Sequence, residues 1–432
     1  ISIFASDMDA YNSTLDEVTF IIDTQPQHGT LQFSGDPQID EELYDDDDWY
    51  LIGALWSQAL IYTPFPGTTA ETDTFTFHVN DSHQDSNIAT ISLTFHTPIT
   101  LHVNVNDDIV DMDGCNAAHC SLREAVAAAL IGDTIDFTLP LPNTITLTAD
   151  SGGELLISQA IHILGPGADR LTISAGFTDP EMDPTEGFRV FHVYNPMGMV
   201  DVEIAGLTIR DGRSFAGGGI LVYENAILTL RDCVIGPSNV VAYAGGGIAV
   251  IYAELNMYGS TVIGNEGTGT LGGAGMVAVS SDLTITNSTI TGNITNNFGG
   301  GLLVQYLSNV NLTHTTISGN IANQDYETQP QGGGGGIVNQ DSTVTMQNCI
   351  VAGNTDLTLP SVHAKWHDVN GSVVSLGGNI VGDKTGSIGW LPGDIAGTST
   401  SPVDPLLGLL NVHEPGKTPT FPLLQGSPAI DF

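Results

Sequence analysis

Two pairs of oppositely charged residues, Arg210-Asp211 and Arg231-Asp232, each follow an apolar-x-apolar tripeptide. Enzymes that cleave acidic polysaccharides by elimination need a base, often Arg or Lys, beside carboxylates that hold Ca²⁺. Matching the two tripeptides predicts that the arginines lie one above the other on adjacent turns of a repeat, with the aspartates beside them. The competing interpretation is that the stacked residues form a ladder of ion pairs on the exterior and bind no substrate, and we favour it. We therefore predict no catalytic residues, with a polysaccharide lyase or hydrolase as the alternative.

Cysteine placement predicts one disulfide and two free thiols. Cys115 and Cys120 are near enough to bridge across a tight loop in an oxidising environment. A zinc site that includes His119 is the alternative, although no second Cys-x-x-Cys or His pair completes it. Cys233 and Cys349 occupy equivalent places in repeats that are four steps apart, which separates them by about 19 Å. We expect both to be buried and unpaired.

A second set of acidic residues, Asp7, Asp9 and Asp81, lies in turn sequences near the N-terminus. Ca²⁺ takes oxygen ligands from neighbouring loops, so these carboxylates are candidate calcium ligands. The alternative is that Asp7 and Asp9 serve only as turn residues, and we favour that interpretation over a metal site. The sequence requires no cofactor, and Ca²⁺ is the candidate it offers.

The charge balance limits the partners. Nine Lys and Arg residues stand against 49 Asp and Glu residues, for a net charge of −40. Such a chain has no cationic surface for nucleic acid or anionic lipid. No apolar run is long enough to span a bilayer. The scarcity of lysine and the wealth of Asn, Thr, Ser and Gly are more usual outside the cell, so we expect a secreted or cell-surface protein.

Beyond residue 198 the chain repeats at a period near 28 residues. Each unit opens with Gly-x-Gly and an aliphatic residue, continues with an alternating strand and ends with Gly-Asn. The asparagines are Asn265, Asn293, Asn320 and Asn354, and we expect them to form an amide ladder. Three short strands and tight turns per unit describe one coil of a right-handed parallel β-helix, since glycine triplets would break an α-helical solenoid.

The segments before the repeats have other patterns. Short alternating runs up to residue 98 are typical of an antiparallel β-sandwich. Ser121 and Glu124 have the spacing of a capping box, which predicts a short helix that Gly132 ends. The predicted fold is all-β, with this helix capping the β-helix. The expected regions are a sandwich (1–98), a cap with the first coils (99–197), repeated coils (198–355) and a closing segment (356–432).

Three resemblances cover nearly the whole chain. Residues 6–9, 27–31, 61–64 and 73–81 resemble the cadherin-like repeat of large bacterial surface proteins. Residues 120–125, Cys-Ser-Leu-Arg-Glu-Ala, with 133–135 and 165–169, closely resemble the CSLREA domain, which begins right-handed β-helices of secreted microbial proteins. Residues 377–382, 404–408, 418–421 and 426–431 resemble the end of choice-of-anchor surface proteins. The resemblances imply architecture and location, because no defined activity attaches to them.

These observations favour a structural or adhesive protein over an enzyme. Cadherin-like repeats normally begin with one more strand, so we expect another polypeptide or upstream sequence to supply it at an open sheet edge. A copy of the same chain would then extend a filament head to tail, and other surface proteins or glycans are the remaining candidate partners. A glycan-binding module would instead need aligned aromatics, and the phase of the repeat tyrosines is uneven: Tyr223, Tyr243, Tyr252, Tyr258 and Tyr306.

Overall fold

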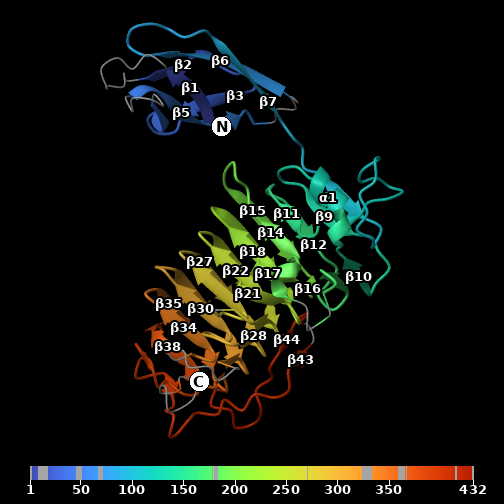
Figure 1. Cartoon of the computed structure of the whole chain (residues 1–432), viewed down its shortest axis with the longest axis vertical. Coiled ribbons are helices and arrows are strands. Elements are labelled where there is room, and N and C mark those ends of the chain that lie inside the picture. The colour runs from blue at the N-terminus through green and yellow to red at the C-terminus, as the bar shows by residue number, and fades with distance from the viewer. Residues whose placement is uncertain are drawn as a thin grey trace. The chain divides into compact units, whose positions relative to one another are not determined.

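The computed structural model describes residues 2–7, 18–44, 51–66, 72–177, 179, 183–269, 271–323, 333–358, 365, 367–413 and 416–430. The chain forms two compact units, Ile1–Thr97 and Pro98–Phe432, which Figure 1 draws in blue and in cyan to red. We call them the sandwich and the β-helix. Among the described residues, none of the helices has the length and apolar character needed to cross a membrane.

The sandwich consists of two antiparallel sheets, as predicted. The first sheet has the order β1-β5-β3, and β4 also pairs with the long strand β5; its strands are β1 (Ser2–Asp7), β3 (Gly29–Phe33), β4 (Gln38–Tyr44) and β5 (Leu51–Pro64). The second sheet has the order β2-β6-β7; its strands are β2 (Thr19–Thr24), β6 (Thr72–Asn80) and β7 (Ala89–Thr94).

Large apolar side chains from both sheets fill the sandwich core. Phe75 and Phe77 alternate with more exposed residues along β6 and are buried. Trp56 of β5, Leu31 of β3 and Phe20 of β2 belong to the same core cluster. An alternating strand has one apolar face, so two such sheets bury their apolar faces against each other.

Four parallel sheets, I to IV, build the β-helix. Sheet I contains β8 (Thr100–Val103), β9 (Thr134–Phe137), β12 (His162–Leu164), β15 (Val200–Ala205), β19 (Ala226–Arg231), β23 (Glu254–Tyr258), β27 (Asp282–Thr286), β31 (Asn309–Thr313), β35 (Thr343–Gln347) and β39 (Val374–Ser375). Sheet II contains β10 (Asn143–Thr146), β13 (Leu171–Ser174), β16 (Thr208–Arg210), β20 (Val234–Ile235), β24 (Thr261–Ile263), β28 (Thr289–Thr291), β32 (Thr316–Ser318), β36 (Ile350–Val351), β40 (Ile380–Val381) and β42 (Ile395–Ala396).

Sheets III and IV complete the coils. Sheet III contains β11 (Leu155–Ile157), β14 (Phe191–Val193), β18 (Ile220–Tyr223), β22 (Ile248–Ile251), β26 (Met276–Val279), β30 (Leu302–Gln305), β34 (Ile337–Gln340), β38 (Val369–Ser372) and β41 (Ser387–Ile388). Sheet IV contains β17 (Arg213–Ala216), β21 (Val240–Ala244), β25 (Glu266–Gly267), β29 (Ile294–Thr295), β33 (Ile321–Ala322) and β37 (Thr355–Asp356). The right-handed parallel β-helix is thus confirmed.

Each regular coil runs through sheets III, I, II and IV in turn, and the colour in Figure 1 moves from green to orange coil by coil. Interior residues stack in register: Leu228 pairs with Leu255, which pairs with Leu283, and all three are buried. The main core cluster therefore runs along the coils without a break from Val103 to Val381.

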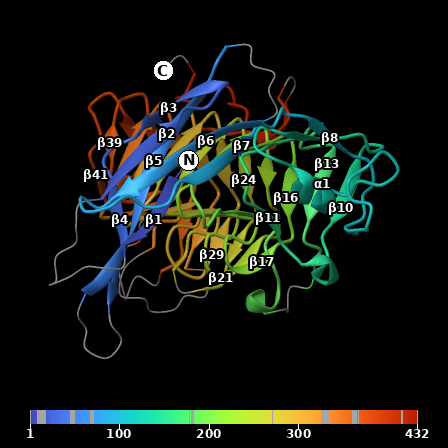
Figure 2. The same ribbon diagram turned by 90° about the horizontal axis from the view of Figure 1, so that it is seen from above.

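Sheet IV is a fourth element of the coil, whereas the sequence predicted three strands. Figure 2 shows β17, β21 and β29 along one side of the coils, apart from β16 and β24. These strands are two to five residues long, too short for a visible alternation. Ala216 and Ala244 of sheet IV pack against Leu221 and Ala249 on the outer face of sheet III, which makes a second, smaller core.

The glycine triplets form the corners between sheets IV and III. Gly245 has a φ of 70°, in the left-handed region that L-residues with a Cβ avoid. A Cβ on Gly247 would lie 2.6 Å from the carbonyl oxygen of Gly275 on the next coil. The triplets thus permit both a sharp corner and close stacking of backbones.

The predicted amide ladder is present. The Nδ2 of Asn265 donates to the Oδ1 of Asn293 at 2.9 Å, and the same bond links Asn293 to Asn320 and Asn320 to Asn354. The row also extends to Asn239 before it and Asp368 after it. The four predicted asparagines are almost fully buried, so each amide bond is formed away from water.

The predicted capping box begins helix α1 (Leu122–Ala128), with Ser121 as N-cap and Glu124 at N3. The helix ends before the predicted Gly132, because the chain turns extended at Ala129. Two 3₁₀ turns follow along the chain, η1 (Ala149–Ser151) and η2 (Pro184–Glu186).

The C-terminal segment runs back along the coils. It contains the short hairpin β43 (Asn411–Val412) and β44 (Pro419–Thr420). Thr261 donates a hydrogen bond to the carbonyl of Pro419, 158 residues later in the chain, and Thr418 donates to the carbonyl of Gly259. Figure 1 shows β43 and β44 beside the middle coils.

Candidate functional site

The structure separates the two Arg-Asp pairs, so the predicted stack is wrong. Arg210 ends β16 in sheet II and lies opposite Ser174 of the preceding coil. Arg231 ends β19 in sheet I and lies between Ala205 and Tyr258. The pairs look alike because each ends a strand at a left-handed corner, with φ of 60° at Asp211 and 51° at Asp232. Asp tolerates that conformation better than most residues, so the shared motif indicates a backbone corner rather than a catalytic site.

Each of these arginines forms an ion pair on its own face. The Nε of Arg210 lies 3.1 Å from the Oδ2 of Asp211, which also accepts a hydrogen bond from Ser174. The Nε of Arg231 lies 2.9 Å from the Oε1 of Glu203, and its guanidinium lies over the ring of Tyr258. A base for proton abstraction must be free to accept a proton, and neither arrangement provides one.

Of the three candidate calcium ligands, the structure describes the side chain of Asp81. Asp7 lies in β1, and Asp9 lies outside the described residues. The Oδ1 of Asp81 accepts hydrogen bonds from the backbone of His83 and Gln84, both at 2.7 Å. The hydrogen bond from Gln84 and, after it, the one from His83 lower the pKa of Asp81. Asp81 therefore acts as a turn residue here, and calcium binding stays a prediction.

The cysteines form one disulfide and two free thiols. Cys115 is bonded to Cys120, so neither sulfur is a thiolate ligand for zinc. Cys233 and Cys349 are free and buried. Burial raises the pKa of Cys233 to about 12 and that of Cys349 to about 11, which keeps both thiols protonated and unreactive.

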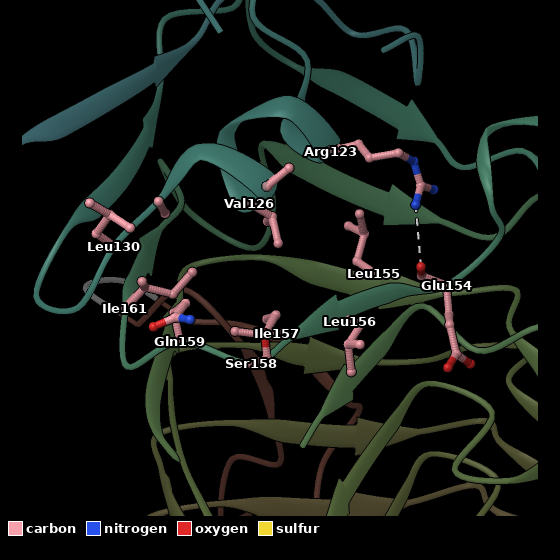
Figure 3. A pocket seen from close by; sticks show the side chains of 12 residues that line it. Arg123, Val126, Leu130, Glu154, Leu155, Leu156, Ile157, Ser158, Gln159 and Ile161 are labelled. Atoms are coloured by element: carbon pink, nitrogen blue, oxygen red, sulfur yellow. Dashed lines mark hydrogen bonds between the residues drawn. The ribbon is translucent and has the colours of Figure 1, made fainter. Parts of the chain in front are cut away.

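A hollow of about 350 Å³ lies between α1 and β11, at the first coils (Figure 3). Its lining is mainly apolar and includes Val126 and Leu130 from the helix segment and Leu156 from the strand. β11 is the terminal strand of sheet III and pairs with β14 on one side. The hollow is thus an apolar surface beside a strand edge.

The two charged residues in this hollow are already engaged. Arg123 binds both carboxylate oxygens of Asp108 and donates to the carbonyl of Glu154, as the dashed line in Figure 3 shows. The carboxylate of Glu154 pairs with Arg189 at 3.0 Å and with His192 at 3.0 Å. Arg123 therefore fixes α1 to the first coils, and this arrangement holds no free acid beside a free base.

The pKa of Glu154 is lowered by its partners. Desolvation alone would raise it, but the hydrogen bond from His192 and the charge of Arg189 outweigh that penalty. The same burial lowers the pKa of Arg189, although Glu154 counteracts the shift. Glu154 is thus held ionised as a structural ion-pair member, the opposite of a general acid, whose pKa must be raised.

The repeat tyrosines lie on several different elements of the coil. Tyr223 ends a strand of sheet III, Tyr243 lies in sheet IV and Tyr258 lies in sheet I. Tyr252 and Tyr306 occupy left-handed corners after sheet III. The uneven phase seen in the sequence therefore corresponds to side chains on different faces of the coil.

His119 lies at the centre of a group of carboxylates that sequence reasoning missed. Its Nδ1 lies 3.0 Å from the Oε2 of Glu124 and 3.4 Å from the Oδ2 of Asp111, and its Nε2 lies 3.3 Å from the Oδ1 of Asp107. Asp111, His119 and Glu124 are the right residue types, at the right spacing, to hold a metal ion. The sequence did contain a signal for this group: four residues that can bind a metal, Asp107, Asp111, His119 and Glu124, occur in one short segment. Both the disulfide and the capping box constrain that segment.

Within the part of the sandwich that the structure describes, β7 is the last strand of its sheet and pairs with β6 alone, which leaves an open edge. Ala89, Ile91 and Leu93 point toward the core but are only half-buried, and the residues between them are exposed. Natural edge strands are usually protected by charges, prolines or bulges, and the sequence of β7 contains neither a charge nor a proline.

Neither the protein-family models nor the curated proteins match this chain. Among solved structures, the crystal structure of pectate lyase Pel9A aligns with 68% of this chain and 70% of its own, with a TM-score of 0.41 and 14% identity. A likeness of this size carries no conclusion about activity. The resemblances to cadherin-like, CSLREA and choice-of-anchor proteins remain predictions.

Proposed function

We propose that this protein is an extracellular structural or adhesive element. The β-helix is a stiff rod, and the sandwich joins copies of the chain head to tail by accepting a strand from a neighbour. Its location is the cell surface or the surrounding medium, and its partners are copies of itself, other surface proteins or surface glycans.

The construction of the β-helix supports the rod. Each coil contributes strands to sheets that continue through neighbouring coils, and the buried asparagines add side-chain bonds between coils. In a stack of this kind each coil contacts only its neighbours, so the coils form a continuous one-dimensional array. The candidate catalytic pairs lie in different sheets and are bound in ion pairs, so this surface suits support better than proton transfer.

The open β7 edge is the observation that carries the proposal. An added strand would pair with the free backbone edge of β7 and cover Ile91 and Leu93, which are only half-buried now. The main-chain bonds would give affinity and the covered apolar side chains would add to it. A net charge of −40 disfavours non-specific association of copies, so assembly would depend on such a specific edge.

The test is electron microscopy of the purified full chain across a concentration series, with and without Ca²⁺. We expect filaments for the parent protein and isolated particles for Ile91→Lys, because the lysine would place a charge where the added strand packs. Thr90→Lys is the matched control, since Thr90 is exposed on the other face of the same strand. Leu93→Lys repeats the test at a second position, and thermal unfolding verifies that each variant is folded.

Monodisperse particles of the parent at every concentration would overturn self-assembly. Ultraviolet absorbance from unsaturated products on pectate and alginate would support the lyase alternative instead. Binding to a glycan array without cleavage would favour a glycan-binding module.

A further inference from the structure

We propose that Asp111, His119 and Glu124 form a binding site for a divalent transition metal, of which Zn²⁺ is the natural candidate. The site would pin the loop between residues 107 and 120 to helix α1. It lies in the β-helix and is independent of the strand exchange proposed for the sandwich.

Three acceptor atoms converge at this point. The Nδ1 of His119, the Oδ2 of Asp111 and the Oε2 of Glu124 all lie within 4.8 Å of one another. The distance from Nδ1 is 3.0 Å to Glu124 and 3.4 Å to Asp111. Ligands bound to zinc at about 2.0–2.2 Å are separated by similar distances in tetrahedral geometry.

A carboxylate on the far side of the imidazole orients the metal-binding nitrogen. The Nε2 of His119 lies 3.3 Å and 3.4 Å from the two oxygens of Asp107. Histidines that bind a metal usually donate their other ring N–H to a carboxylate, which fixes the tautomer. With the proton on Nε2, the lone pair of Nδ1 faces two carboxylate oxygens, and a metal ion between them would contact all three atoms.

The ligands are held in place before any metal arrives. The Oδ1 of Asp111 accepts hydrogen bonds from the backbone of Asp113 and Gly114, which leaves Oδ2 toward His119. The Oε1 of Glu124 accepts from the backbone of Asp111, and its Oε2 accepts from that of Ser121. The disulfide closes the loop that carries His119. Such support is what a preorganised metal site needs.

Exposure and ligand type select the metal. The side chain of Glu124 is 1% exposed, whereas those of His119 and Asp111 are 23% and 37% exposed, so an ion can enter from solvent and keep bound water. Imidazole nitrogen suits zinc and its neighbours, while Ca²⁺ prefers oxygen ligands alone. The site thus differs in position and chemistry from the calcium site predicted in the sandwich.

A proton is the competing occupant. The two ring N–H groups of a protonated His119 would donate to Glu124, 3.0 Å from Nδ1, and to Asp107, 3.3 Å from Nε2. A protonated Nδ1 would then make the contacts that the metal would make. Because metal binding needs the neutral imidazole, the two occupants are distinguished by titrating the metal at alkaline pH.

The experiment uses the full chain, stripped with a chelator, and titrates Co²⁺ and then Zn²⁺ at pH 8 with calorimetry and visible absorption. We expect one strong site, a cobalt spectrum typical of a nitrogen–oxygen ligand set, and its loss on adding Zn²⁺. Asp111→Asn and His119→Gln should each weaken binding at least tenfold. Asp111→Asn retains an oxygen for the loop hydrogen bonds, so the fold is preserved.

His162→Gln is the matched control, since His162 pairs with Glu203 on sheet I, away from this loop. It should leave the strong site unchanged. If the parent binds no metal at pH 8, the occupant is a proton only and the proposal is overturned. Equal affinity in the parent and His119→Gln would place the metal elsewhere, with the same consequence.

Discussion

In the sandwich a core side chain meets its partners across two facing sheets, whereas in the β-helix each interior side chain also stacks on the equivalent residue of the next coil. The sandwich depends on a few large residues such as Phe75, Phe77 and Trp56. The β-helix uses a long row of smaller aliphatic residues and adds buried amides between coils. The first design concentrates stability and leaves strand edges along its sides. The second spreads stability, and the strands with one free edge that the structure describes are those that end each sheet.

The largest expected effect is a loss of stability in the sandwich, with the β-helix unchanged. Phe75 is fully buried, so Phe75→Ala should lower the free energy of unfolding of the sandwich by about 4 kcal/mol through lost burial and the cavity that remains. Calorimetry of the full chain should show the sandwich transition at a lower temperature and the β-helix transition unchanged. Phe33→Ala, at a residue that is 45% exposed, is the control and should shift neither by a comparable amount. A joint shift of both transitions would show that the units unfold together.

A smaller loss is expected from removing one rung of the amide ladder. Asn320 donates to the carbonyl of Ile290 and to Asn354, and it accepts from Asn293. Asn320→Ala leaves these buried groups without partners and should cost the β-helix about 3 kcal/mol, measured by urea unfolding. Asn311→Ala, at an exposed position on the same coil, should be nearly neutral. Equal effects would mean that the ladder adds nothing beyond the backbone bonds.

The smallest effect concerns pH and the first coils. The folded-state pKa of Glu154 lies below its ordinary value of 4.5, so its ionisation stabilises the β-helix above that pH. The stabilisation is lost as the pH falls through the folded-state pKa. Glu154→Gln should therefore cost about 1 kcal/mol at pH 7 and progressively less below pH 4.5.

Thermal unfolding of both proteins across this pH range measures the difference. Glu186→Gln removes an exposed carboxylate of the same unit and should show no such trend. A constant difference between Glu154→Gln and the parent at every pH would attribute the loss to packing rather than to charge.

Sequence reasoning succeeded where one residue type repeats or where a local motif has one solution. Asn265, Asn293, Asn320 and Asn354 recur at one corner, and stacking equivalent coils places each amide next to the following one. Ser121 and Glu124 form the capping box because that motif is complete within four residues. Sequence reasoning failed where the same local motif occurs at two different places in the coil. Arg210-Asp211 and Arg231-Asp232 share a motif, yet they end strands of different sheets.

Features formed by folding of a loop could not be read from spacing alone. Asp107, Asp111, His119 and Glu124 converge only after the loop closes on α1, and their backbone hydrogen bonds decide which oxygens face the imidazole. Sheet IV was missed for a different reason: strands such as Glu266–Gly267 carry too few side chains to display a period.

The row of buried amides has a direction. Every asparagine donates from its side-chain amide toward the C-terminus, and the last one, Asn354, donates to the Oδ1 of Asp368. A second asparagine at the end of the β-helix, Asn379, likewise donates to an aspartate, Asp394. Each of these two aspartates is therefore the last acceptor for the side-chain amides. A β-helix lengthened by further coils would need asparagines at these two positions and aspartates on its new last coil.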